Sequence, residues 1–212
     1  MRIKEFIRKY QDIFYFKSIE RLLKGCDSVL DVGCGADSPL KRVKKTFYSE
    51  GIDIFEESIR QSKKKKIHDK YKISDIRKID KIYGKKSFDA VIGLDVIEHL
   101  DKKDSIALIK KMENIARKKV LLLTPNGFYH QDAYDDNPYQ VHVSEWKLED
   151  LRVLGYRVYG LRGLKYLRGE YATIKYKPWF FWGIIVFFSE LPLFFFPKAS
   201  YHLFAVKNID RS

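Results

Sequence analysis

The sequence predicts an α/β protein with a Rossmann-like, doubly wound sheet and helices on both faces. Two observations predict this fold class. Short apolar runs alternate with longer polar stretches of helical period, a pattern typical of βαβ units and a parallel sheet. The first apolar run ends in Gly33 and Gly35, and glycines at such a turn let the backbone pass close to a bound ligand.

The elements follow from the pattern in chain order. A leading amphipathic helix is expected within residues 1–25, where apolar side chains recur with helical spacing. Ser38 is a good N-cap and Pro39 a good first helical residue, so a helix should follow the glycine turn. Asp101 should cap a helix over 102–117, and a further helix is expected over 145–154. The expected strands cover residues 28–32, 48–54, a short stretch near Ile73, 88–94, 119–124, 157–161 and 201–207.

Composition supports a folded, basic protein. The chain has 212 residues, 45% of them hydrophobic, and a formal net charge of +13. This apolar content argues against general disorder, and without repeats or low-complexity linkers we expect one domain over 1–212. Two cysteines are too few for a disulfide framework, and residues 1–25 lack the apolar run of a secretion signal. The expected location is therefore cytoplasmic.

The residues around the glycine turn indicate the kind of ligand. Asp53, at the end of the second expected strand, could accept both hydroxyls of a ribose. A dinucleotide fingerprint would need glycine where Ser38 stands, and Asp31 would repel a pyrophosphate, which disfavours a nicotinamide oxidoreductase. An acid at Asp31 instead suits a cationic ligand with a free amino group, such as S-adenosylmethionine.

Four ordered motifs then carry a family resemblance. They are Leu30–Gly35, Gly51–Ile54, Ser74–Ile76 and Phe88–Leu100. With them the chain resembles the class I S-adenosylmethionine-dependent methyltransferases, in the branch with VLDVGCG and FDxVxxxxVxEHL motifs. The likeness extends from Val29 to Thr124 and more weakly to Trp146. It implies a seven-stranded sheet with an antiparallel last strand, and S-adenosylhomocysteine as the product.

The resemblance also implies a set of cofactor-binding residues. The methionine part would lie among Asp31, Gly33, Cys34 and Gly35, with Leu94 and Asp95 at its end; the ribose at Asp53; and the adenine at Ile54, Asp75 and Ile76. Asp37 is a departure, because many relatives have glycine there.

Two regions are candidates for catalysis. Asp95, Glu98 and His99 are spaced to share one face of a helix after the fourth strand. His99 could act as a base or brace this helix, and a divalent metal held by Asp95, Glu98, His99 and His142 is the alternative; no metal is expected. The long loop over 125–146 is expected to bind the acceptor, with His142 as the leading base. Its candidate acceptor-binding residues are Asn126, Gln131, Tyr134, Asn137 and Trp146.

An aromatic insertion over 178–197 precedes the last strand. Between Trp179 and Phe196 only Ser189 and Glu190 are polar. Glu190 and Pro192 disfavour a membrane span, which would also separate the last strand from its sheet. The insertion could cover one edge of the fold, or residues 178–198 could contact an anionic membrane or an apolar acceptor, on the inner membrane face.

The expected activity is methyl transfer to an oxygen, nitrogen or carbon atom of a small, glycan or lipid-linked acceptor. Nucleic acid is a less favoured partner, although residues 60–72 are strongly basic, because the sequence shows no appended RNA-binding module. The alternatives are an RNA methyltransferase and a non-catalytic protein that binds S-adenosylmethionine. The acceptor and the oligomeric state stay open.

Overall fold

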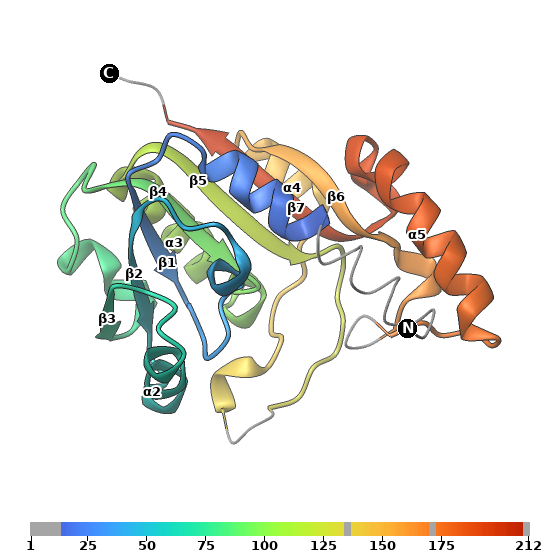
Figure 1. Ribbon diagram of the computed structural model, residues 1–212, viewed down its shortest axis with the longest axis horizontal. Coiled ribbons are helices and arrows are strands. Elements are labelled where there is room, and N and C mark those ends of the chain that lie inside the picture. Colours follow the sequence, from blue (N-terminus) through green and yellow to red (C-terminus); the bar gives the residue numbers. More distant parts are fainter. Residues whose placement is uncertain (1–13, 134–136, 170–172, 210–212) are drawn as a thin grey trace.

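The computed structural model describes residues 14–133, 137–169 and 173–209. One seven-stranded sheet runs through it in the order β3-β2-β1-β4-β5-β7-β6 (Figure 1). Strands β3, β2, β1, β4 and β5 are parallel to one another, whereas β7 is antiparallel to both β5 and β6. This confirms the predicted fold class. The strands are β1 (Ser28–Val32), β2 (Tyr48–Asp53), β3 (Lys70–Ile73), β4 (Phe88–Leu94), β5 (Ala116–Pro125), β6 (Arg157–Leu164) and β7 (Ser200–Asn208).

Helices cover both faces of the sheet (Figure 1). Residues 14–23 are helical, while the rest of the expected leading helix lies outside the described residues. The labelled helices are α2 (Glu56–Lys64), α3 (Lys102–Ile115), α4 (Leu148–Val153) and α5 (Trp179–Phe195). As expected, the Asp101 side chain caps α3 by accepting from the Asp104 amide at 2.8 Å.

Several element bounds differ from the expectation. Helix α3 ends at Ile115 and not at 117, because Ala116 is already extended and begins β5. Helix α4 begins at Leu148 and not at 145, since the Asp150 carboxylate accepts from the Lys147 amide at 2.8 Å and fixes the first turn there. Only a short 3-10 turn, Pro39–Arg42, follows the glycine turn, although Ser38 does cap it.

The segment after β4 corrects a further expectation. Asp95 has a positive φ of 56°, and only a 3-10 turn over Ile97–His99 follows it. Asp95, Glu98 and His99 therefore do not share one face of an α-helix, because the left-handed residue breaks the helical geometry on which that spacing argument depends.

The sheet buries side chains alternately on its two faces. Leu30 and Val91 pack in the cluster that includes α3 and α4, whereas Val29 and Ile92 pack in the cluster that includes residues 14–23. This period of two is the geometry of a strand buried on both sides. It explains why the central strands read as continuous apolar runs in the sequence.

Helix α5 packs along β6 at the edge of the sheet (Figure 1). A Cβ atom added at Gly163 would lie 2.6 Å from the Val186 carbonyl oxygen, so the close approach of the helix depends on that glycine. The apolar insertion is thus a helix on the fold's edge, with part of its apolar surface exposed. None of the helices in the described part of the chain combines the length and apolar character that crossing a membrane requires.

Candidate active site

A cavity of about 690 Å³ opens at the carboxyl ends of β1, β2 and β4. Ligands bind at this edge of open α/β sheets because the loops that follow parallel strands meet there. Its wall includes the glycine turn, the start of α2 and the end of β4. Arg162 of β6 and Arg168, which follows β6, also lie on the wall. The predicted site residues on the wall are Gly33, Cys34, Gly35, Leu94, Asp95 and Asn137.

The glycine turn has the backbone geometry that the sequence predicts. Gly33 and Gly35 have φ values of 69° and 56°, in the left-handed region that glycine adopts at little cost. A Cβ at Gly33 would lie 2.7 Å from a Val96 methyl group, whereas a Cβ at Gly35 would meet no protein atom within 4 Å. Gly35 therefore presents bare backbone to the cavity, which is what a closely bound ligand needs.

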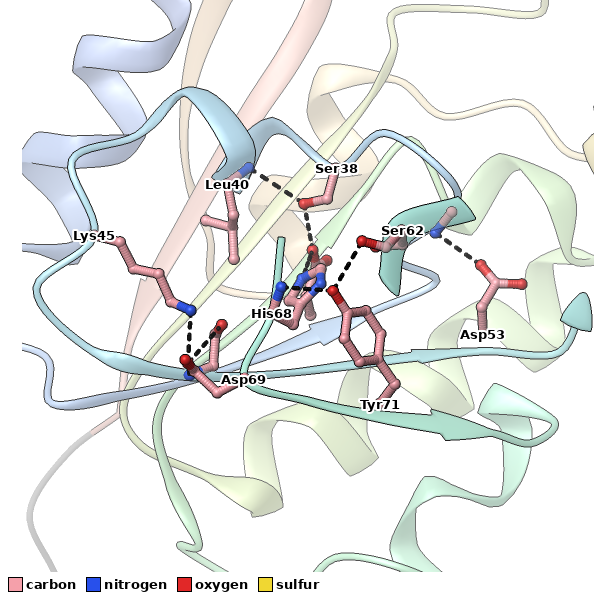
Figure 2. Close-up of polar contacts among 11 residues, drawn as sticks. Ser38, Leu40, Lys45, Asp53, Ser62, His68, Asp69 and Tyr71 are labelled. Carbon is pink, nitrogen blue, oxygen red and sulfur yellow. Dashed lines mark hydrogen bonds and ion pairs between the residues drawn. The ribbon is translucent and has the colours of Figure 1, made fainter. Parts of the chain in front are cut away.

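Asp31 supports this turn from beneath. Its carboxylate is 2% exposed and lies outside the cavity wall. It accepts a hydrogen bond from the Ser38 hydroxyl at 2.5 Å and lies 3.0 Å from His68 Nε2. Ser38 in turn accepts from the Leu40 amide, so the network joins the turn to the residues after it (Figure 2). His68 was missed by sequence reasoning because it lies 37 positions from Asp31 in no recognisable motif.

Asp53 is the last residue of β2, at the place where a ribose-binding carboxylate was expected. Its two oxygens accept from the Gly35 and Phe55 amides, each at 2.9 Å. Burial raises its pKa, against the effect of these hydrogen bonds. The neighbouring residue on the cavity wall is Phe55, not the expected Ile54.

Asp75 and Ile76 lie farther along the edge of the sheet. The Asp75 carboxylate caps the 3-10 turn Ile76–Lys81 by accepting from the Arg77 amide, and neither Asp75 nor Ile76 lies on the cavity wall.

The turn accommodates Asp37 by turning its side chain outward. The carboxylate is 56% exposed and lies 3.2 Å from the Lys41 ammonium and 3.4 Å from that of Lys65. These contacts outweigh the effect of burial and lower the pKa of Asp37. An acid is therefore tolerated here at the rim of the cavity, where the family resemblance led us to expect glycine.

Asp95 lies on the cavity wall, directly after β4. Its side chain is 42% exposed, but the space that it faces is enclosed by protein, and this enclosure raises its pKa to about 6. His202 Nε2 from β7 lies 3.5 Å from an Asp95 oxygen. Burial lowers the pKa of His202 well below its usual value, so this imidazole is neutral beside the carboxylate. His202 and the wall residues Arg162 and Arg168 carry no sequence signal, since only the tertiary fold brings them here.

Glu98, His99 and His142 form a second group of polar side chains. Their nearest donor atoms all lie within 4.8 Å of one another, close enough to hold a divalent cation. His99 Nδ1 lies against the Val141 carbonyl oxygen, and His142 Nδ1 lies against the Tyr129 carbonyl oxygen. The Nε2 atom of each ring takes no part in these two contacts. Both Glu98 oxygens are buried without a hydrogen-bond partner, and burial raises the Glu98 pKa well above its usual value. Asp95, the fourth ligand that the sequence suggested, is not part of this group.

The residues expected to bind the acceptor lie at different depths. The Asn126 amide donates to the Lys198 and Ser200 carbonyl oxygens, and Trp146, 1% exposed, donates to the Ile97 carbonyl oxygen. Asn137 and Gln140 are on the cavity wall. Gln131 is not on the wall, but its side-chain amide donates to the Gln140 carbonyl oxygen. Tyr134 lies outside the described residues.

The comparisons with known proteins agree with this geometry. A family profile described as a methyltransferase domain matches residues 7–162. The chain belongs to this family, and it is an S-adenosylmethionine-dependent methyltransferase. A comparison with curated proteins finds none that matches the sequence.

Solved structures show the same fold. A SAM-dependent methyltransferase from Archaeoglobus fulgidus superposes with a TM-score of 0.58 at 20% identity, over 91% of this chain and 94% of that one. The methyltransferase domain of bacterial CtHen1-C gives 0.58 at 19% identity, over 93% and 97%. Magnesium protoporphyrin IX methyltransferase from Synechocystis PCC 6803, with bound SAM, gives 0.51 at 19% identity, over 95% and 84%.

The cofactor of this methyltransferase is S-adenosylmethionine. The cavity, of about 690 Å³, has the volume of a small-molecule site. The Gly35 amide donates to the Asp53 carboxylate, so this carboxylate lies beside the open backbone of the turn, although Asp53 itself is not on the cavity wall. The wall continues past Asp95, so it also has room for an acceptor.

Proposed function

We propose that this methyltransferase methylates an oxygen, nitrogen or carbon atom of a small, glycan or lipid-linked acceptor beside Asp95. The observation that carries the proposal is that one cavity contains both the glycine turn and, beyond Asp95, polar and cationic residues that the cofactor motifs do not account for. S-adenosylmethionine supplies an electrophilic methyl group, which bonds to the acceptor atom as its bond to sulfur breaks and S-adenosylhomocysteine leaves.

In this proposal the cofactor occupies the end of the cavity that contains the glycine turn. Gly33, Cys34 and Gly35 bind the methionine part and Asp53 the ribose, with Phe55 against the adenine. Asp31 acts through the turn that it supports. Support comes from the wall residues and from the hydrogen bond between the Gly35 amide and Asp53.

Asp95 is our candidate for accepting the acceptor's proton. It borders the cavity where the fourth motif ends, and with its pKa of about 6 it is mostly ionised at neutral pH. His202 stays neutral beside it and can share the proton through a hydrogen bond. His99 and His142, which the sequence favoured, contact each other with ring centroids 4.8 Å apart and lie off the cavity wall. We assign them the role of holding the loop that carries Asn137.

Cofactor titration followed by an acceptor screen tests the function. We expect the protein to bind S-adenosylmethionine and S-adenosylhomocysteine but not NADH, and to transfer a radiolabelled methyl group to a lipid or glycan fraction. Transfer to RNA, with binding that weakens steeply as salt rises, would instead support an RNA methyltransferase. Cofactor binding without transfer to any fraction would identify a non-catalytic binding protein.

We further propose that α5 places the enzyme at an anionic membrane surface. Phe181, Ile184, Phe188, Leu191 and Phe195 recur with helical spacing and are all exposed. Such a stripe next to lysines is typical of a helix that lies in a membrane interface. Lys175, Lys177 and Lys198 are exposed beside it. A lipid-linked acceptor would then lie on the surface to which the enzyme binds.

A further inference from the structure

Arg162 has an unusual backbone conformation for its residue type. Its φ is 64°, and Gly163 follows with a φ of 67°, where the pairing of β6 with β7 shifts register between Leu161 and Leu164. A left-handed arginine is strained, and the surrounding structure has to hold it in that conformation. The bulge turns Arg162 onto the wall of the cavity that contains Asp95.

Helix α5 holds this bulge with its two polar residues. Glu190 Oε1 accepts from the Arg162 amide at 2.7 Å, and Ser189 Oγ accepts from the Leu164 amide at 3.2 Å. These are the residues that interrupt the apolar run in the sequence. They face the sheet and satisfy backbone donors that the irregular strand leaves without strand partners.

Arg168 reaches the same wall from the segment after β6. It is 6% exposed, and its Nε donates to the Arg162 carbonyl oxygen. Burial and the proximity of Arg162 lower its pKa to about 10, so it is still charged at neutral pH. The positive charge of Arg162 works against the raised pKa of both Asp95 and Glu190, so these carboxylates lie near it, although neither forms an ion pair with it in the described part of the chain. Two guanidinium groups on one cavity wall attract an anion.

The order of strands places these arginines away from the cofactor end. The glycine turn follows β1 and Asp53 ends β2, whereas β6 lies three strands beyond β4. With strands about 4.8 Å apart, β6 is about 14 Å from β4, and an arginine side chain covers part of that gap. The guanidinium groups therefore extend the cavity beyond Asp95, on the side where an acceptor would enter.

We propose that Arg162 and Arg168 bind an acidic group, a carboxylate or a phosphate, on the methyl acceptor. This inference rests on the proposed function and narrows its acceptor to an anionic molecule. The bulge in β6 and the polar pair Ser189 and Glu190 on α5 are the structural support of this subsite.

The test measures anion binding with the cofactor site already filled. The protein is saturated with S-adenosylhomocysteine and titrated with inorganic phosphate and, separately, with acetate, by calorimetry. We expect at least one anion to bind, and the preference between them indicates which acidic group the acceptor carries. Arg162→Gly suits the left-handed backbone, so it removes the guanidinium without adding strain. It should weaken anion binding about tenfold or more, the loss of a charge-assisted pair.

Arg157→Met is the matched control. Arg157 is an exposed arginine at the start of the same strand and is not on the cavity wall, so this variant should bind the anion as the wild type does. Arg162→Lys keeps the charge but not the two-pronged geometry and should fall between wild type and Arg162→Gly.

Three results would overturn the inference. They are anion binding that Arg162→Gly leaves unchanged, anion binding that Arg157→Met reduces equally, and a loss of S-adenosylhomocysteine affinity in Arg162→Gly. The last result would mean that the arginines hold the cofactor's own carboxylate. Each of these leaves methyl transfer intact as a function, whereas failure of the wild type to bind S-adenosylhomocysteine would contradict the proposed function itself.

Discussion

At the scale of single residues, backbone strain separates site residues from surface turns. Four non-glycine residues in the described part of the chain have positive φ, namely Lys66, Lys86, Asp95 and Arg162. The two lysines lie in turns outside the cavity, whereas Asp95 and Arg162 are both on its wall. Such conformations persist only where the surrounding structure enforces them. Asp95 and Arg162 therefore indicate a functional site in which the backbone holds two charged side chains in defined positions.

Gly35 gives the first residue-scale prediction. Gly35→Ala should weaken S-adenosylmethionine binding by about tenfold or more, because the new methyl group occupies the open backbone and the left-handed conformation becomes strained. Calorimetric titration measures the change. Gly84→Ala is the control, since its Cβ also meets open space but Gly84 is off the cavity wall. Equal affinities for Gly35→Ala and wild type would refute close backbone approach of the cofactor.

Asp95 gives the second, through pH. Its pKa is raised to about 6, so the carboxylate that accepts a proton becomes populated as pH rises through that value. Turnover at saturating cofactor should therefore increase from about pH 5 to 7 and then level off. Asp95→Asn should lower turnover and abolish this inflection. His142→Ala should keep it; a profile lost in His142→Ala and retained in Asp95→Asn would return the role of base to His142.

At the scale of elements, β6 and α5 act as one unit. The glycines Gly160 and Gly163 let the helix approach the strand, and Ser189 and Glu190 bond to its irregular backbone. Phe194 of α5 also stacks on Tyr159 of β6, with ring centroids 4.6 Å apart. Helix α5 therefore presents its exposed apolar stripe to the outside, and β6, packed against the helix, presents Arg162 to the cavity.

This unit predicts different outcomes for two substitutions of Glu190. Burial raises the Glu190 pKa to about 7, so its neutral and ionised forms are both present near neutral pH. Glu190→Gln keeps an acceptor for the Arg162 amide and should fold with near wild-type stability. Glu190→Leu leaves that amide without its partner and should cost about 1–3 kcal/mol. Urea unfolding measures both, and equal stabilities would show that the hydrogen bond does not hold the bulge.

The ionisation of Glu190 also sets a pH trend. An acid whose pKa is raised in the folded state opposes folding once pH exceeds its unfolded value, and the penalty is complete above the folded value. Wild-type stability should thus fall, relative to Glu190→Gln, as pH rises from about 4 to 8. If the stability difference between wild type and Glu190→Gln stayed constant over this range, the pKa of Glu190 would not be raised in the folded protein.

At the scale of the whole molecule, charge and apolar surface point to the same kind of partner. The net charge is +13, and the described part of α5 exposes Phe188 at 71% and Leu191 at 62%. Charge attracts the protein to anionic lipid over a distance, and apolar burial then retains it. Neither contribution alone distinguishes a membrane from an RNA or a protein partner.

Vesicle flotation tests the combination. The protein should float with vesicles that contain phosphatidylserine, less so with neutral ones, and less as salt rises. The double variant Phe188→Ser and Leu191→Ser should reduce flotation several-fold. Val153→Ser is the control, because Val153 on α4 is 87% exposed but not part of the stripe. If the double variant floats like wild type, α5 does not contact the membrane.

The sequence by itself determined the sheet and the cofactor end. Short apolar runs and the capping residue Asp101 act locally, so β1, β4 and α3 lie close to where the pattern predicted them. Gly33, Gly35 and Asp53 could be found because they follow strands at fixed spacing. Even here the helix after β4 was wrong, since the left-handed Asp95 depends on packing that periodicity does not report.

Only the tertiary structure decided what lies beyond Asp95. Arg162 and Arg168 reach the cavity because α5 holds a bulge in β6, and His202 meets Asp95 because β7 inserts beside β5. His68 lies against Asp31, and Trp146 is in the core rather than at the surface of its loop. These contacts join residues far apart in the chain. A sequence pattern reports the local period that sets each strand and turn, but the long-range packing that aims a side chain across a cavity leaves no such period.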